Sequence, residues 1–100
     1  MELACGTGSL SLELAKRGYD MISCDISPDM LSVASDKCRV LDEPPRFICQ
    51  DMSELDLYGT VDGCVCALDS INYITDLRQL KRTFKRLSMF LNDGGLFRCV

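Results

Sequence analysis

The sequence contains no histidine and no tryptophan, and only three of its 100 residues are proline. Histidine is the commonest general base and the commonest metal ligand, so its absence predicts a protein without a metal site. Seven cysteines are present, but no two of them form a C-x-x-C pair, which argues against zinc binding. We expect reduced thiols in a cytoplasmic protein, several of them buried in strands as small apolar side chains.

Long apolar runs are also absent. The longest one, residues 64–68, is far shorter than the roughly 20 residues that cross a bilayer, so we expect no contact with a membrane. The first residues do not resemble a secretory signal. The net charge of −4 argues against general affinity for nucleic acid, which needs a basic face. With 47% hydrophobic and 26% charged residues, the composition is typical of one globular domain.

The spacing of apolar residues changes repeatedly along the chain, and the changes coincide with turn signals. This pattern predicts a first strand whose tail is residues 3–5, and further strands at 21–24, 46–50, 61–68 and 96–100. Helices are predicted at 9–17, 28–39 and 76–91. Ser27 and Pro28 are typical of a helix start. In the last helix an apolar stripe is expected to pack on a sheet, because two heptads are too few for a coiled coil; it comprises Leu77, Leu80, Phe84, Leu87 and Leu91. Strands separated by helices predict an α/β fold with a doubly wound, mostly parallel sheet.

Acidic residues mark four of the expected strands. Glu2 lies in the first strand, and three more acids follow the next three strands; these are Asp25, Asp51 and Asp69. Ligands of such sheets bind at the carboxyl ends of the strands. Four acids at one edge, beside a glycine loop, point to a ligand with hydroxyl groups and positive charge.

The glycine loop is Gly6-Thr7-Gly8, where the backbone can approach a ligand closely and turn into the next helix. Asp25 follows Gly8 by 17 residues, close to the spacing at which an acid accepts hydrogen bonds from ribose hydroxyls. We therefore expect a nucleoside site. The dinucleotide fingerprint G-x-G-x-x-G needs a third glycine at position 11, which holds Ser11. A plain strand-to-helix turn remains the alternative interpretation of the loop.

Residues 2–8, Glu-Leu-Ala-Cys-Gly-Thr-Gly, resemble the first motif of class I S-adenosylmethionine-dependent methyltransferases. The resemblance continues in order through residues 25–31, 50–52, 68–73 and 91–95. It implies S-adenosyl-L-methionine as the cofactor and a Rossmann-like, three-layer α/β/α fold. That family usually has a seven-stranded sheet, and this chain has room for about five strands. Residues 1–100 are therefore expected to be the cofactor-binding domain of a longer enzyme, truncated at both ends.

The resemblance also implies roles for individual residues. Gly6 and Gly8 would face the methionine part of the cofactor, and Asp25 would bind the ribose. Asp51 and Met52 would bracket the adenine, and Glu2 would orient the loop or favour the cationic end of the cofactor. The remaining expected cofactor-binding residues are Ala4, which stands where the family most often has glycine, Ile26, Met30 and Leu68.

Methyl transfer from a sulfonium needs alignment more than acid–base chemistry, so the lack of histidine is no obstacle. If the acceptor must lose a proton, Asp69 and Tyr73 are the candidates. We expect a small-molecule acceptor, with a tRNA base as the alternative. A basic face on the last helix is either a patch for RNA or an acidic carrier, or a solvated surface; it comprises Arg78, Lys81, Arg82, Lys85 and Arg86. A nicotinamide-dependent oxidoreductase and a non-catalytic cofactor-binding module are the rival functions.

Overall fold

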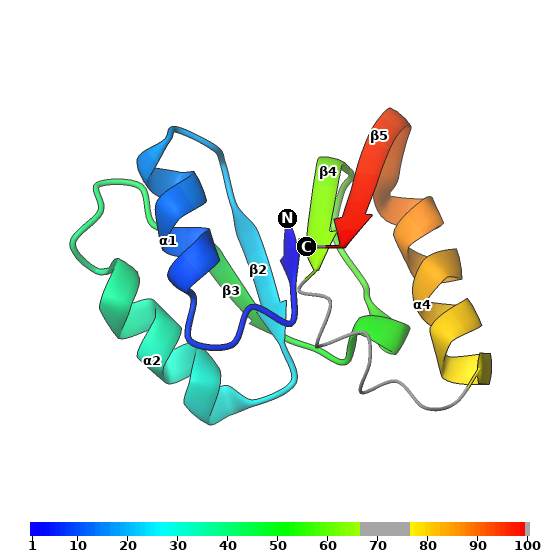
Figure 1. The fold of residues 1–100 in the computed structure, drawn as a ribbon, viewed down its shortest axis with the longest axis horizontal. Coiled ribbons are helices and arrows are strands. Elements are labelled where there is room, and N and C mark those ends of the chain that lie inside the picture. The colour runs from blue at the N-terminus through cyan, green and yellow to red at the C-terminus, as the bar shows by residue number, and fades with distance from the viewer. Residues whose placement is uncertain (67–76, 100) are drawn as a thin grey trace.

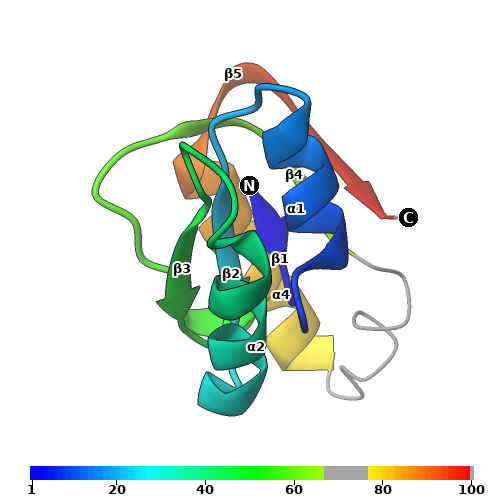
Figure 2. The same cartoon turned by 90° about the vertical axis from the view of Figure 1, so that its left-hand side faces the viewer.

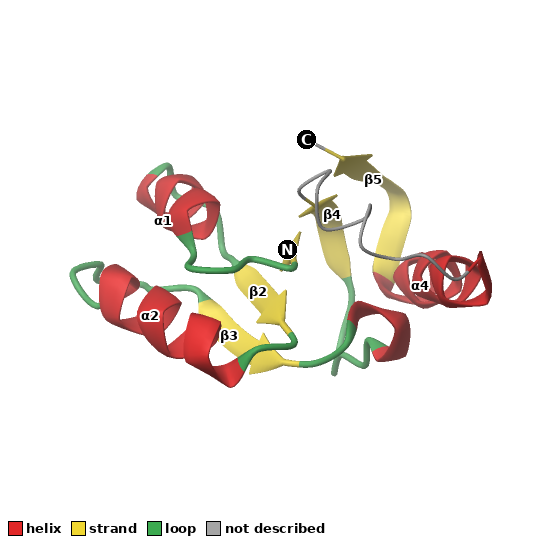
Figure 3. Ribbon diagram, turned by 60° about the horizontal axis from the view of Figure 1, so that its bottom comes forward, coloured by secondary structure: helices red, strands yellow, loops and turns green. Residues whose placement is uncertain are grey.

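The computed structural model describes residues 1–66 and 77–99. These residues form a five-stranded sheet from β1 (Glu2–Leu3), β2 (Ile22–Asp25), β3 (Arg46–Cys49), β4 (Val61–Cys66) and β5 (Leu91–Cys99). The strand order is β3-β2-β1-β4-β5, and the described pairings are parallel. The shared strand direction can be followed in Figure 3 for β2 and β3. The predicted parallel α/β sheet is confirmed.

Helices cover both faces of this sheet. Helices α1 (Ser9–Lys16) and α2 (Pro28–Cys38) lie on one face, and α4 (Leu77–Phe90) lies on the other (Figures 1 and 2). A short 3-10 turn, η1 (Met52–Glu54), packs beside α4. The predicted three-layer arrangement is therefore confirmed. Strand β1 is central, and the helices that follow β1 and β4 lie on opposite faces, so a ligand crevice is expected at the carboxyl edge near these two strands.

Local chemistry explains where α2 begins. The Ser27 hydroxyl accepts a hydrogen bond from the Met30 amide at 3.3 Å, and Pro28 occupies the first helical position. Asp29 adds a negative charge to the first turn, which the helix dipole favours. The predicted helix start is confirmed at this residue.

The main core cluster lies around the central strands. It contains Leu3 from β1, together with Met1, Cys24, Leu55, Cys64, Cys66 and Leu87. Three of its seven members are cysteines. The prediction that cysteines serve as small apolar side chains in strands is confirmed for Cys24, Cys64 and Cys66.

The inner face of α4 differs from the predicted stripe. Leu87 is buried as expected, but Leu77 and Phe84 are 64% and 44% exposed, and Thr83 is buried instead. The Thr83 hydroxyl donates to the Gln79 carbonyl oxygen at 2.9 Å, so its burial leaves no polar group unpaired. The Phe84 ring still reaches β5, where it meets Phe97 edge to face with ring centroids 5.7 Å apart.

Two strand boundaries also differ from the expectation. The first strand ends at Leu3, because Ala4 has a φ of 52° and cannot continue an extended strand. The last strand begins at Leu91, which pairs with Val61, and not at Leu96. The register shifts between Val61 and Gly63, so the predicted turn at residues 92–95 is an irregularity inside β5.

Candidate cofactor site

The glycine loop leaves β1 in an unusual backbone conformation. Ala4, Gly6 and Gly8 have φ values of 52°, 56° and 81°, in the left-handed region. The Gly8 amide donates to the Cys5 carbonyl oxygen at 3.0 Å and closes a tight turn before α1. Ala4 thus occupies a position that favours glycine, which is the residue most often found there in the family that the motif resembles.

Gly8 also packs closely on α2. A Cβ atom at this position would lie 2.7 Å from the Cβ and 3.2 Å from the Cα of Ala34. Contacts below 3.0 Å are not tolerated without movement, so both the backbone angle and the packing require glycine. The loop is therefore packed closely against α2.

Asp25, at the end of β2, joins the second strand to the glycine loop. Its Oδ2 accepts a hydrogen bond from the Gly6 amide at 2.8 Å, and its Oδ1 accepts one from the Ser27 amide at 2.9 Å. The side chain stays half-buried. A carboxylate has about four acceptor sites, so Asp25 can hold the loop and still accept hydrogen bonds from a ligand.

Asp51 follows β3 at the same edge of the sheet. Its Oδ1 accepts hydrogen bonds from the Ser53 amide at 2.9 Å and from the Ser53 hydroxyl at 2.8 Å. Asp51 therefore caps η1, and Met52 in η1 packs against the core cluster. Gln50 fixes the same segment, because its side chain donates to the Asp56 carbonyl oxygen and accepts from the Asp56 amide at 3.0 and 3.1 Å.

Two apolar side chains after Asp25 remain open to solvent. Ile26 and Met30 are 67% and 45% exposed, which is high for such large apolar residues. They lie at the carboxyl edge of β2 and in the first turn of α2. They supply apolar surface next to the polar Asp25 carboxylate.

Glu2 lies beneath the loop and not at its surface. It is 3% exposed, and its Oε1 accepts a hydrogen bond from the Ser11 hydroxyl at 2.5 Å. Burial raises the pKa of this carboxyl, and the hydrogen bond from Ser11 opposes that increase. Of the two roles expected for Glu2, the geometry favours orientation of the loop.

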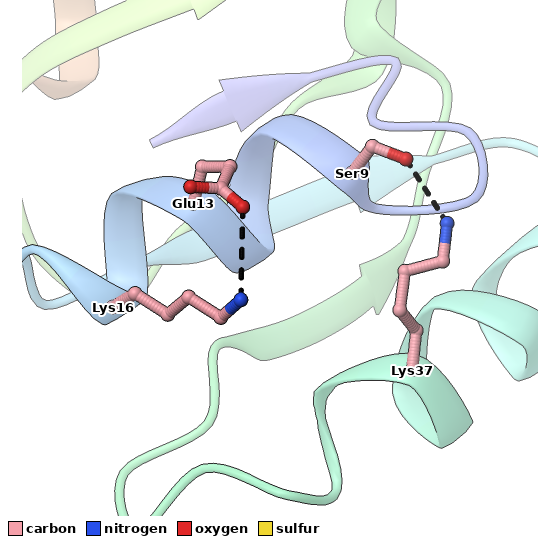
Figure 4. A network of polar contacts seen from close by, with 4 residues as sticks. All are labelled: Ser9, Glu13, Lys16 and Lys37. Carbon is pink, nitrogen blue, oxygen red and sulfur yellow. Dashed lines mark hydrogen bonds and ion pairs between the residues drawn. The ribbon is translucent and has the colours of Figure 1, made fainter.

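Lys37 on α2 reaches over the start of α1. Its Nζ donates to the Ser9 hydroxyl at 3.0 Å (Figure 4). It also donates to the Thr7 hydroxyl at 3.3 Å. Lys16, which lies on α1 with Ser9, forms an ion pair with Glu13 at 3.7 Å and does not contact the loop in this way (Figure 4). Lys37 thus adds positive charge beside the loop, at the amino end of α1.

The structure brings together most of the predicted cofactor residues at one edge. These are Ala4, Gly6, Gly8, Asp25, Ile26, Met30, Asp51 and Met52, with Glu2 below them. Leu68, Asp69 and Tyr73 lie outside the described residues. Within the described ranges there is no group of three or more Cys, Asp or Glu side chains that could hold a metal ion. No helix in the same ranges is long and apolar enough to cross a membrane.

Several contacts at the site were not predicted from the sequence. The Gly6–Asp25 hydrogen bond, the reach of Lys37 and the contact between Ser11 and Glu2 join residues 9 to 30 positions apart. Only Ser11 had a signal, because a serine among the leucines of an amphipathic helix, near a strand that carries an acid, is a potential partner for that acid.

The fold is a parallel α/β sheet with the candidate site residues gathered at its carboxyl edge. A family model described as a methyltransferase domain matches residues 1–95, and the chain belongs to this family. A solved S-adenosylmethionine-dependent methyltransferase from Clostridium acetobutylicum is 43% identical, with a TM-score of 0.89, and the match covers 96% of this chain and 39% of that one. The fold is that of S-adenosylmethionine-dependent methyltransferases, as the resemblance implied.

Curated relatives agree with this assignment. A putative methyltransferase from Geobacillus is 32% identical over 96 residues, which is 96% of this chain and 39% of the relative. A magnesium-protoporphyrin O-methyltransferase from Rhodobacter capsulatus is 38% identical over 79 residues, covering 73% of this chain and 32% of that protein. The chain thus spans about 39% of the length of the Geobacillus relative.

Proposed function

We propose that the protein is an S-adenosyl-L-methionine-dependent methyltransferase that acts on a small-molecule acceptor, with residues 1–100 as its cofactor-binding domain. The observation that carries this proposal is the 2.8 Å hydrogen bond between the Gly6 amide and Asp25. It fixes the glycine loop next to a half-exposed carboxylate at the carboxyl edge of a parallel sheet. The methyltransferase family match supports the same function.

The residues at this edge fit the proposed cofactor. Asp25 has free acceptor sites for the ribose hydroxyls, and Ile26 and Met30 offer exposed apolar surface for the adenine. An added Cβ at Gly6 would meet no atom within 4 Å, so we assign this side of the loop to the methionine part, with Gly8 holding the turn against α2. We assign Asp51 and Met52 to the adenine side. S-adenosylmethionine carries no phosphate, so the lack of a third glycine at Ser11 is no loss. We also propose that the backbone of Leu68 lies near the methionine amine of the cofactor.

When bound, the cofactor supplies a reactive sulfonium methyl group. The chain's own contribution is then to hold the cofactor and align its methyl group with the acceptor. The glycine loop and Asp25 would do this without a general base. Where an acceptor must lose a proton, we propose Asp69 or Tyr73, in the segment that follows β4.

Ligand binding tests the cofactor assignment. S-adenosylhomocysteine should raise the melting temperature of the purified protein, and NADH should not. Asp25→Ala should abolish the shift, whereas Asp29→Asn, a change to an exposed acid of α2, should retain it. Because Asp25 also holds two backbone amides, urea unfolding of the unliganded variant must show that it is folded. Stabilisation by NADH alone would identify a nicotinamide enzyme, and unchanged affinity of Asp25→Ala would remove the ribose role.

The acceptor needs a separate experiment. A small-molecule acceptor is consistent with the magnesium-protoporphyrin enzyme among the relatives. The exposed basic side chains of α4 keep tRNA as the other outcome. Transfer of a radiolabelled methyl group into a metabolite pool or an RNA pool would identify the acceptor class, and transfer into neither would indicate a non-catalytic module. A cytoplasmic location is part of the proposal, supported by the unoxidised buried thiols of Cys5, Cys24 and Cys64.

A further inference from the structure

A buried polar cluster lies directly beneath the glycine loop. It consists of Glu2 from β1, Ser11 from α1 and Ser23 from β2, and both serines are fully buried. The Ser11 hydroxyl lies 2.5 Å from Glu2 Oε1 and 2.6 Å from the Ser23 hydroxyl. Three elements that surround the loop are thus joined through three side chains.

The chemistry of the groups sets the direction of these hydrogen bonds. An ionised carboxylate only accepts, so Ser11 donates to Glu2. The single hydroxyl hydrogen of Ser11 is then used, and Ser23 must donate to the Ser11 oxygen. Ser23 therefore acts on Glu2 through Ser11. Removal of either hydroxyl weakens the interaction that favours the charged form of Glu2.

The cluster connects the two ends of the loop. Glu2 precedes Ala4, where the chain turns into the left-handed region, and Ser11 lies in the first turn of α1, just after Gly8. Ser23 lies two residues before Asp25 on β2, so it shares a face of that strand with the acid. A shift of any of these three elements would move Gly6 relative to Asp25.

We propose that Ser11 and Ser23 are positioning residues for cofactor binding, which act through Glu2 to fix the glycine loop relative to Asp25. Their role rests on the proposed function, because it concerns the same site. It also gives position 11 a purpose. A serine stands where the dinucleotide fingerprint has glycine, and its hydroxyl is the partner of the acid in the first motif.

The affinity for S-adenosylhomocysteine, measured by calorimetry, tests this proposal. Ser11→Ala and Ser23→Ala should each weaken binding by about tenfold, the lower end of the loss seen when a group that orients a metal ligand is removed. Ser23→Thr, which keeps the hydroxyl, should restore affinity, and Ser32→Ala, an exposed serine of α2, should have no effect. Urea unfolding must show that each variant is folded. Ser23→Ala keeps the Ser11–Glu2 hydrogen bond, so it should destabilise the fold less than Ser11→Ala.

The pH profile of binding separates positioning from general destabilisation. Without Ser11 the pKa of Glu2 rises further, so the acidic decline in affinity should move to higher pH. The other titratable groups that interact with Glu2 are Asp25, the amino group of Met1 and the thiols of Cys5 and Cys64. A Glu2→Gln variant shows which decline belongs to Glu2, because that decline disappears.

The possible failures are distinguishable. If the unaltered protein does not bind S-adenosylhomocysteine, the proposed function is wrong. If it binds, and the folded Ser11→Ala and Ser23→Ala variants keep its affinity and pH profile, the function stands and the positioning role is overturned. A lower affinity with an unchanged pH profile would also overturn the role through Glu2.

Discussion

Replacement of Gly8 by alanine tests how the glycine loop is held against α2. The φ of Gly8 is 81°, and an added Cβ would lie 2.7 Å from the Ala34 Cβ. An L-residue in the left-handed region costs about 1–2 kcal/mol, and overpacking a buried contact costs about 1–3 kcal/mol more. The reduced freedom of the unfolded chain returns about 0.4–1 kcal/mol. We expect Gly8→Ala to lower the free energy of unfolding by about 1–5 kcal/mol.

Urea unfolding, followed by circular dichroism, measures this loss. Gly18→Ala is the matched control, because Gly18 has a φ of 93° but no atom within 4 Å of the added Cβ. It carries the backbone cost alone, about 1 kcal/mol. The difference between the two variants therefore isolates the contact with Ala34.

A double-mutant cycle tests the contact itself. Ala34→Gly alone should destabilise the protein by about 1 kcal/mol or more, because glycine is unfavourable inside a helix. Combined with Gly8→Ala it should recover about 1 kcal/mol relative to the sum of the single variants. Recovery is partial, since the Ala34 Cα would still lie 3.2 Å from the new Cβ. If Gly8→Ala costs no more than Gly18→Ala and the two changes are additive, packing on α2 does not select glycine here.

Two further predictions concern residues next to the site. Ala4→Gly should change the free energy of unfolding by less than about 1 kcal/mol, because relief of the backbone strain is offset by a more flexible unfolded chain. Ala4→Val should lower the free energy of unfolding by about 2 kcal/mol. Equal stability of the two variants in urea would contradict the strained φ. At pH 8, iodoacetamide should label exposed Cys49 before Cys24 or Cys64. Burial raises the pKa of Cys24 to about 11 and that of Cys64 to about 12, so neither thiol is ionised at this pH. Peptide mapping that finds Cys64 of the folded protein labelled first would refute the prediction.

The sheet could be predicted from the sequence because its signals are local. Ser27 and Pro28 determine a helix start through their own backbone geometry, and short apolar runs followed by acids mark the strand ends. The positions of the candidate site residues followed from the same strand ends. Parallel strands bring their carboxyl ends to one edge, so residues 2–8, 25–30 and 51–52 had to meet there.

The inner face of α4 could not be predicted in the same way. Because threonine is polar, the sequence predicts Thr83 on the exposed face of the helix. The Thr83 hydroxyl donates to the Gln79 carbonyl oxygen of its own helix, so the side chain is buried without an unpaired group. The start of β5 was missed for a different reason. Asn92 donates to Asp62, and Gly95 allows the backbone to pass close to the Asp62 carbonyl, so the segment pairs with β4 where the sequence indicates only a turn.

The structure gives Glu2, Asp25 and Asp51 different surroundings. Asp25 accepts hydrogen bonds from two backbone amides and remains half-buried. One carboxylate can therefore fix the loop and also stay within reach of a ligand. Glu2, at 3% exposure, has no such access and acts on the loop from below through hydroxyl groups. Asp51 uses one oxygen to cap η1 and so orders the segment that carries Met52. Burial and hydrogen-bond partners, and not residue type, distinguish these roles. Asp→Asn or Glu→Gln changes at the three positions should therefore affect affinity, pH profile and local order in different ways.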